Sequence, residues 1–139
     1  MSTLPVPSPP VTAETAPFWN AIDESRLILP RCLACRTVIW YPRTFCPVCH
    51  RAGVEWVECS GMGSIYSFAV TQKGDGPWRD AGPYVLAYVE LDEGPRVLTN
   101  IVECDPSSVV VGQPVEVVFE RNGDGRALPR FRPRTDGSH

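Results

Sequence analysis

Histidine, glycine-rich phosphate loops and long apolar runs are scarce in this sequence, and each scarcity excludes a class of protein. The chain has two histidines, His50 and His139, so a Ser–His–Asp catalytic arrangement has little support. Gly61-Met62-Gly63 lacks the following glycine and lysine that hold phosphates. No apolar run approaches the ~20 residues of a membrane span, and residues 1–10 lack the basic start and apolar segment of a signal peptide. We therefore expect a cytoplasmic protein with no membrane segment and no catalytic residues of its own.

Lysine is nearly absent, and the charge is unevenly spread. Lys73 is the single lysine among 13 basic residues, against 16 acidic ones. Five arginines and no carboxylate lie between Arg26 and Arg51, whereas nine acidic residues and two arginines lie between Gly74 and Glu120. The net charge of −3 does not require a nucleic-acid partner. The pattern indicates a basic first half and an acidic second half.

Cysteine is where the sequence is most informative. Two CxxC pairs, Cys32 with Cys35 and Cys46 with Cys49, are separated by ten residues. Two residues between the members of a pair allow both sulfurs to face one ion, and four thiolates complete a closed tetrahedron. The spacing predicts one structural zinc ion, with rubredoxin-like iron as the alternative because its ligands are the same. Such a site leaves no open position for substrate, and it contributes on the order of 10 kcal/mol to folding.

The remaining cysteines and histidines are not expected to bind this metal. Free cysteines are usually small buried apolar residues, which is our interpretation of Cys59 and Cys104. His50 follows Cys49 directly and cannot easily turn back to the same ion. His139 is the last residue of the sequence.

Hydrophobic periodicity predicts a mainly β protein with one short helix. Pro17 suits the first turn of a helix that ends near Glu24 or Ser25. Arg26–Leu29 is expected to be a brief strand that stops at Pro30. The expected strands that follow are Ser64–Thr71, Tyr84–Leu91, Arg96–Val102, a strand with Val115, Val117 and Phe119 facing inward, and Leu128–Phe131. Five strands in about 70 residues favour a small β-barrel, because closure removes exposed edges. The count fits an OB-fold and leaves an SH3-like barrel or a sandwich open.

Two of these strands carry face assignments. Alternation places Tyr66, Phe68 and Val70 on one face of the first barrel strand. The segment Tyr84–Leu91 is apolar on both faces, which predicts a strand covered on both sides.

These elements divide the chain into five parts. They are a disordered or draped arm (1–12), an N-terminal helical segment (13–30), the zinc ribbon (31–60), the barrel (61–133) and a disordered tail (134–139).

Two groups of residues outside the metal motif are candidates for ligand or partner contacts. Trp78 lies in a loop rich in glycine and proline, where it either anchors a partner or folds back over the barrel. The guanidinium group of arginine forms paired hydrogen bonds with phosphates. The candidate arginines for contacts with a ligand or a partner are Arg31, Arg36, Arg51, Arg130 and Arg132. For the first three, neutralising the −2 charge of a four-thiolate zinc site is the alternative.

The order of short motifs resembles a known family. The motifs are Pro17-Phe18-Trp19, Arg26-Leu27, the two CxxC pairs, Gly61-Met62-Gly63-Ser64-Ile65-Tyr66-Ser67, Pro83-Tyr84-Val85, Val89-Glu90-Leu91-Asp92-Glu93-Gly94, Gly112-Gln113-Pro114-Val115 and Leu128-Pro129-Arg130-Phe131. Together, over residues 16–133, they resemble the domain-of-unknown-function thirty-five family. The chain departs from it at Arg36 and His50, where family members often have a glycine after the second cysteine of a knuckle.

The resemblance implies a rubredoxin-like zinc ribbon, a five-stranded OB-fold barrel and an accessory role. Family members accompany thiolase-superfamily enzymes that act on acyl-CoA, either thiolases or lipid-transfer-protein-like retro-aldolases of steroid side-chain degradation. A MaoC-like hydratase often accompanies the latter. The partner would supply the catalytic residues, and this subunit would stabilise it and help form the acyl-CoA channel.

Two other functions are alternatives to an accessory role. A single-stranded nucleic-acid-binding module could stack bases on Trp40, Tyr41, Tyr66 and Phe68, but the acidic second half argues against it. A stand-alone hydrolase lacks a catalytic set.

Overall fold

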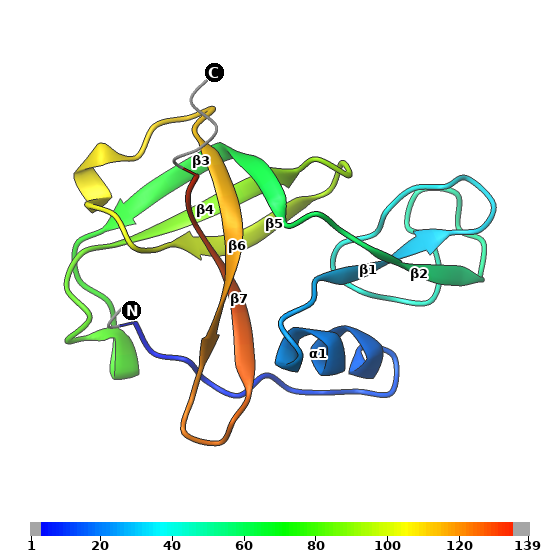
Figure 1. Ribbon diagram of the computed structural model, residues 1–139, viewed down its shortest axis with the longest axis horizontal. Helices are drawn as coiled ribbons and strands as arrows, with labels where there is room; N and C mark the ends of the chain where they lie inside the picture. The colour runs from blue at the N-terminus through cyan, green and yellow to red at the C-terminus, as the bar shows by residue number, and fades with distance from the viewer. Residues whose placement is uncertain (1–3, 135–139) are drawn as a thin grey trace.

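A computed structural model describes residues 4–134, and Figure 1 shows a small two-stranded module beside a barrel. The elements in chain order are α1 (Ala16–Asp23), β1 (Ile28–Cys32), β2 (Val54–Glu58), β3 (Met62–Thr71), the 3-10 turn Gly76–Trp78, β4 (Tyr84–Leu91), β5 (Arg96–Ile101), the 3-10 turn Pro106–Ser108, β6 (Pro114–Arg121) and β7 (Ala127–Pro133). The expected fold class, mainly β with one short helix, is confirmed.

The barrel closes in the order β3-β4-β5-β7-β6, with β6 returning to β3. The neighbours are antiparallel, except that β5 runs parallel to β7 and pairs with it only at Ile101 and Phe131. Phe131, Val85 and Ile65 are almost fully buried in its core. The strand order, with its parallel β5–β7 pair, and the closure confirm the expected OB-fold barrel, and they exclude an open sandwich.

The strand β4 is buried on one face only, which corrects the expectation that it is covered on both. Val85, Ala87 and Val89 point into the core, with at most 1% of their surface exposed. Leu86 and Tyr88 on the opposite face are 42% and 46% exposed. The run is apolar on both faces, but within residues 4–134 only the inner face is covered.

A β-bulge corrects the face assignment in β3. The register with β4 shifts between Ile65 and Ser67, so one extra residue is inserted and the alternation changes phase. Ile65 therefore points into the core, Tyr66 is 48% exposed, and Phe68 packs against the core cluster. Tyr66 does not share a face with Phe68 because the bulge lies between them.

The strand β1 continues through Pro30 to Cys32, two residues beyond the expected stop. The carbonyl of Pro30 accepts a hydrogen bond from the Ile39 backbone, and the Cys32 N–H donates to Thr37. The segment that contains Ile39 therefore uses Pro30 only as a hydrogen-bond acceptor. The absence of an N–H on proline removes no hydrogen bond to that segment.

The helix α1 joins the two modules. Phe18 and Ile22 are completely buried. At its end Asp23 accepts a hydrogen bond from the Ala127 backbone (3.0 Å) and pairs with Arg126 (3.2 Å). The helix therefore contacts β7 of the barrel while it leads directly into β1.

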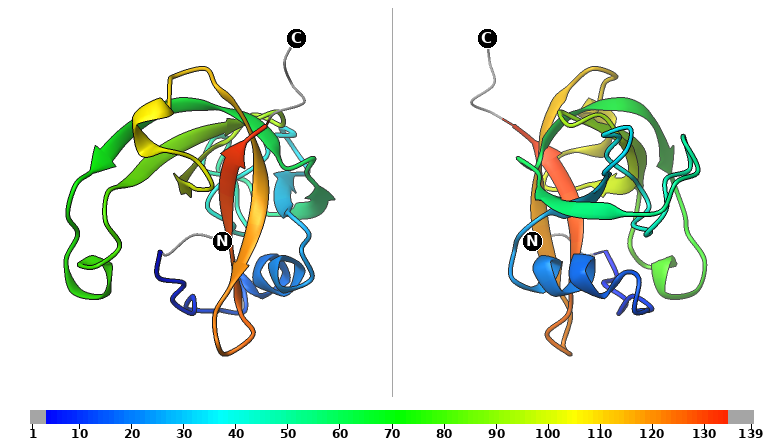
Figure 2. Two further views of the ribbon diagram at one scale, coloured as in Figure 1. Left: turned by 60° about the vertical axis from the view of Figure 1, so that its left-hand side comes forward. Right: turned by 90° about the vertical axis from the view of Figure 1, so that its right-hand side faces the viewer.

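The amino-terminal segment 4–12 has no helix or strand, and it runs along the β6–β7 hairpin before α1 (Figure 2). Ser8 accepts a hydrogen bond from Asn122 (2.8 Å), and Arg130 donates to the carbonyl of Pro5. Residues 4–12 are therefore draped over the barrel, which is one of the two alternatives expected for the amino-terminal arm. The expected disordered tail lies outside the described residues, except for Arg134.

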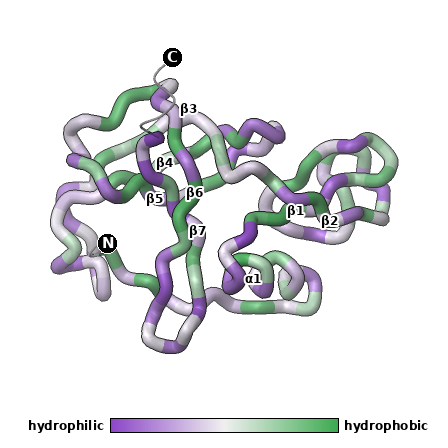
Figure 3. The backbone as a smooth tube through the Cα atoms, viewed as in Figure 1, coloured by the Kyte–Doolittle hydropathy of each residue, from purple (hydrophilic) through white to green (hydrophobic). Residues whose placement is uncertain are grey.

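Hydrophobic stretches follow the barrel strands, whereas the tip of the β6–β7 hairpin is hydrophilic (Figure 3). Within residues 4–134, no helix has the length and the apolar character that a membrane crossing requires.

Candidate functional site

The four cysteines of the two CxxC pairs converge on one point of the small module. Their Sγ atoms all lie within 4.8 Å of one another, with Cys32 to Cys49 at 3.5 Å and Cys35 to Cys46 at 3.6 Å. Four sulfurs bound to one zinc ion at ~2.3 Å lie about 3.8 Å apart. The spacing therefore fits a tetrahedral metal ion. Cys32 ends β1, and the other three lie in the two loops of the ribbon.

Two tight knuckles position these sulfurs. Arg36 donates its backbone N–H to Cys32, and His50 donates to Cys46, each at 2.9 Å. Both residues have a left-handed backbone conformation, with φ angles of 70° and 63°. This conformation costs a non-glycine residue roughly 1–2 kcal/mol, and glycine adopts it without that cost. His50 is a knuckle residue and is not part of the cysteine cluster.

Hydrogen bonds favour the ionised form of two of the four thiols, Cys35 and Cys32, whereas the pKa of Cys49 is raised to about 11. The Thr37 hydroxyl, 3.2 Å from Cys35, lowers the pKa of that thiol to about 6. The backbone N–H of Cys35 lowers the pKa of Cys32. Thiolate is the form that binds a metal, so the donor set fits zinc or iron. Burial instead raises the pKa of Cys59 to about 12, and this thiol lies in the main core as expected.

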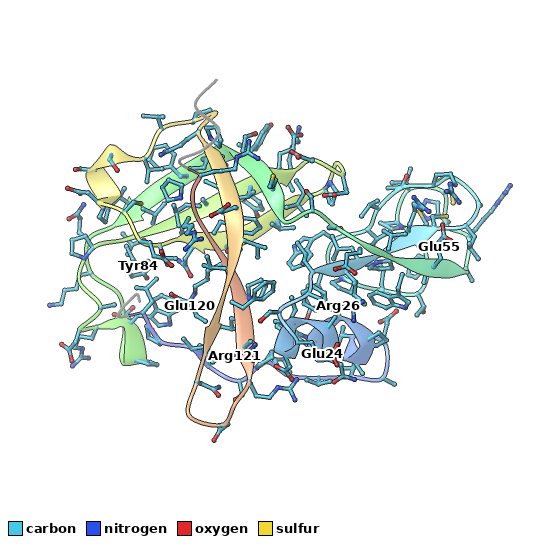
Figure 4. All side chains as sticks on the ribbon, viewed as in Figure 1. Glu24, Arg26, Glu55, Tyr84, Glu120 and Arg121 are labelled. Carbon is cyan, nitrogen blue, oxygen red and sulfur yellow. The ribbon has the colours of Figure 1, made fainter. Side chains whose placement is uncertain are left out.

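The arginines of the ribbon do not form one cluster. Arg31 and Arg36 both contact Glu55, at 2.6 and 3.1 Å, and these contacts lower the pKa of Glu55. Arg51 follows the second knuckle and makes no ion pair with any residue between 4 and 134. Glu55 is labelled on the ribbon in Figure 4.

A second candidate site lies where the ribbon, α1 and the barrel meet. Trp78 packs on Tyr84 with ring centroids 4.9 Å apart, and the guanidinium of Arg130 lies 5.7 Å from the Trp78 ring. Arg130 is only 3% exposed and forms a 2.6 Å ion pair with Glu120. Figure 4 shows Glu120 and Tyr84 on the same side of the barrel. Trp78 is therefore folded back over the barrel and is half-buried.

Trp78 and Arg130 line a cavity of about 230 Å³, which we call the tryptophan pocket. Its walls include Trp19, Trp40, Trp78, Leu98 and Arg130. The walls are mainly apolar, and a few polar groups meet there, which is the usual composition of a small-molecule site.

The pocket unites only two of the six residues that the sequence suggested for ligand contacts. Trp78 and Arg130 meet there, but Arg132 points elsewhere and pairs with Glu116 (2.8 Å) and Glu103 (3.2 Å). Sequence reasoning missed Leu98 as a pocket residue. The only sequence signal for Leu98 was the alternation of the strand, which places it on the opposite face from its neighbour Val97.

The aromatic residues considered for base stacking are divided between different surroundings. Trp40 and Tyr41 form edge-to-face contacts with Phe18, at centroid distances of 5.6 and 6.2 Å. Tyr66 lies beneath the Arg96 guanidinium at 3.8 Å. These rings do not form a continuous stacking platform.

Two family models match consecutive parts of the chain. The first is described as the rubredoxin-like zinc ribbon domain of ChsH2 and matches residues 19–55. The second, the C-terminal OB-fold domain of ChsH2, matches residues 56–120. The boundary between them falls within β2.

Curated relatives carry two kinds of name. A DUF35 domain-containing scaffold protein from Methanothermobacter thermautotrophicus is 38% identical over 130 residues, which is 88% of this chain and 98% of the relative. A protein of the same name from Methanocaldococcus jannaschii is 39% identical, over 83% of this chain and 87% of the relative. A probable enoyl-CoA hydratase alpha subunit from Thermomonospora curvata is 35% identical over 91% of this chain, which spans only 40% of that relative.

Solved structures share the same arrangement. A chain of the Ltp2-ChsH2(DUF35) aldolase superimposes with a TM-score of 0.79 at 35% identity, over 90% of this chain and 98% of the other. A DUF35-family protein of unknown function from Sulfolobus solfataricus gives a TM-score of 0.65 at 16% identity, which shows the fold alone.

Proposed function

Since this chain belongs to the DUF35 family of proteins with a zinc ribbon and an OB-fold, we propose that it is a non-catalytic accessory subunit. Its partner is a thiolase-superfamily enzyme that acts on acyl-CoA, either a lipid-transfer-protein-like retro-aldolase of steroid side-chain degradation or a thiolase. The subunit stabilises this enzyme and contributes a wall to its acyl-CoA channel.

One observation carries the proposal. The chain matches 98% of the length of a chain in the Ltp2-ChsH2(DUF35) aldolase at 35% identity, so the likeness extends across both modules. The name of the scaffold relatives supports the same role. This chain corresponds to only part of the length of the hydratase alpha subunits. The rest of those relatives would supply the hydratase, so we propose a MaoC-like hydratase as an additional partner.

The metal site supports a structural role within that subunit. The four cysteines supply all the ligands of a tetrahedral ion, so no position is left for substrate or water. We assign zinc, because it holds such sites without redox chemistry. The ion would fix the two loops of the ribbon against β1. We propose a cytoplasmic location, because the cytoplasm keeps thiols in the reduced form that binds the ion.

The tryptophan pocket is the part of this chain that we assign to the acyl-CoA channel. Its apolar walls suit an acyl chain better than a phosphate, because the buried Arg130 is already paired with Glu120. Of the three ribbon arginines that the sequence suggested for ligand contacts, Arg31 and Arg36 pair with Glu55. Arg51 forms no ion pair within residues 4–134, and it is the remaining candidate for a CoA phosphate.

Co-expression tests the proposal. The full chain, carrying an affinity tag, is produced together with a thiolase-superfamily protein from the same genome, which we call the candidate partner. We expect the two to purify as one complex and the partner to lose acyl-CoA turnover or solubility when produced alone. A partner that is fully active and stable alone, and that does not purify with the chain, would contradict the proposal.

A further inference from the structure

The outer face of the barrel carries a group of exposed apolar side chains. Tyr66, Leu86, Tyr88 and Leu98 lie on β3, β4 and β5, and each is 42–48% exposed. We call these four residues the outer apolar face. Single exposed apolar residues are normal, but a contiguous group of large ones marks an interaction site.

The strand register makes this group contiguous. Tyr88 pairs with Leu98 on β5 and with Ser67 on β3, directly beside Tyr66. Leu86 occupies the next outward position of β4. Between these strands lies a shallow groove of about 230 Å³, lined by Phe68, Leu86, Tyr88 and Leu98 among others.

The face is bordered by charges that neutralise each other. Glu90 and Arg96 are cross-strand partners and form an ion pair at 3.3 Å. The same Arg96 lies over the Tyr66 ring. A neutral, tyrosine-containing surface resembles the buried core of protein interfaces, from which charged residues are depleted. This composition favours an uncharged protein surface over nucleic acid as the occupant.

The face is continuous with the tryptophan pocket. Leu98 lines both the outer groove and that pocket. It lies on β5, which pairs with β7 at only one position. A partner seated on Leu98 therefore also reaches the rim of the pocket. Figure 2 shows β3 and β4 as an arc that extends away from the β6–β7 hairpin.

The area of the face argues for a large partner rather than a second copy of this chain. Four half-exposed side chains present roughly 350 Å², whereas a stable interface buries ~800 Å² per partner. A symmetric contact through these residues alone is too small for a stable dimer. A partner that docks here must therefore cover more surface than these four residues, and the rim of the tryptophan pocket is the adjoining part.

We propose that the outer apolar face is the docking surface for the catalytic partner, which presents an uncharged apolar patch to it. This inference rests on the proposed function and adds the surface through which it operates. Docking here would also bring the partner to the rim of the tryptophan pocket.

Charge insertion tests the surface. Binding of the purified full chain to the candidate partner, a thiolase-superfamily protein from the same genome, is measured by calorimetry for the unmodified chain, Tyr88→Arg and Leu86→Arg. Both substitutions place a charge on an exposed strand position, and two variants guard against one that fails to fold. We expect each to weaken binding at least about 30-fold.

Matched controls separate docking from general damage. Val48→Arg adds the same charge at a position on the second knuckle that is 65% exposed, and it should leave binding within about twofold. Tyr88→Phe keeps the apolar ring and should bind within about threefold of the unmodified chain. Circular dichroism and metal content confirm that each variant is folded.

The outcomes are distinct. Folded variants of the outer apolar face that bind normally, or a Val48→Arg that binds worse than they do, would overturn the docking surface and leave the proposed function intact. Failure of the unmodified chain to bind would contradict the proposed function itself, and the docking surface with it. If sedimentation shows the unmodified chain as a dimer that Tyr88→Arg dissociates, the face belongs to a second copy and the inference is wrong.

Discussion

The ribbon and the barrel are held together by different forces. In the ribbon, the separate buried cluster consists of Cys32, Ile39 and Cys46, so two of its three members are candidate metal ligands. In the barrel, apolar side chains from all five strands join α1 in one continuous core. A module with so small a core needs a metal ion to fold, whereas the barrel is stabilised by apolar burial. The difference predicts that each region can be weakened without the other.

Removing the metal should have the largest effect. Chelation with a strong zinc ligand should remove on the order of 10 kcal/mol of metal-linked stability from the ribbon. Hydrogen exchange read by mass spectrometry should then show fast exchange in residues 31–58 and continued protection in β4 and β5. If chelation leaves the ribbon protected, the assignment of the metal as its main stabilising element is wrong.

The reciprocal change in the barrel should be smaller but still severe. Phe131 is 2% exposed and lies in the main core, so Phe131→Ala should lower the free energy of unfolding by about 3–5 kcal/mol through lost burial and a cavity. Urea unfolding followed by circular dichroism measures this. Phe45→Ala, at a ribbon position that is 46% exposed, is the matched control and should cost well under 1 kcal/mol.

Relieving strain at one knuckle should stabilise the ribbon slightly. His50 is exposed and has a left-handed backbone conformation. Glycine adopts that conformation without a Cβ clash. The variant His50→Gly should gain up to about 1 kcal/mol after the extra entropy of glycine in the unfolded chain is subtracted. Retention of zinc during a chelator titration is the readout. Weaker retention than in the unmodified chain would mean that the Cβ clash is not the dominant cost there.

The smallest expected effect is pH-dependent. Arg31 and Arg36 hold the pKa of Glu55 below its ordinary value of 4.5, so the folded state favours the ionised carboxylate. The stability that Glu55 adds is therefore present above pH ~4.5 and is lost as pH falls through its lower folded pKa. Glu55→Gln should lower the thermal unfolding midpoint at pH 7, and the difference should shrink below pH 4.5. A difference that stays constant over that range would exclude this ion pair as its source.

Local chemistry explains why the sequence predicted that the four cysteines converge. The ligands come in pairs two residues apart, so their spacing alone brings each pair together, and the knuckle residues Arg36 and His50 could be identified from the same motif. The apolar alternation of Tyr84–Leu91 likewise gave the bounds of β4, because strand periodicity is a local property.

Tertiary context explains what the sequence did not predict. The bulge at Tyr66 depends on the register between β3 and β4, and the exposure of Leu86 depends on which side of β4 another layer covers. Trp78 and Arg130 are 52 positions apart in the sequence and meet only because the barrel closes. No periodicity in the chain encodes these relations.

Sedimentation velocity on an equimolar mixture of this chain with the candidate partner, a thiolase-superfamily protein from the same genome, tests the accessory role most directly. At about 10 μM of each, the account predicts one boundary that contains both proteins and sediments faster than either alone. Two boundaries at the positions of the separate proteins, from a chain with its full complement of metal, would contradict it.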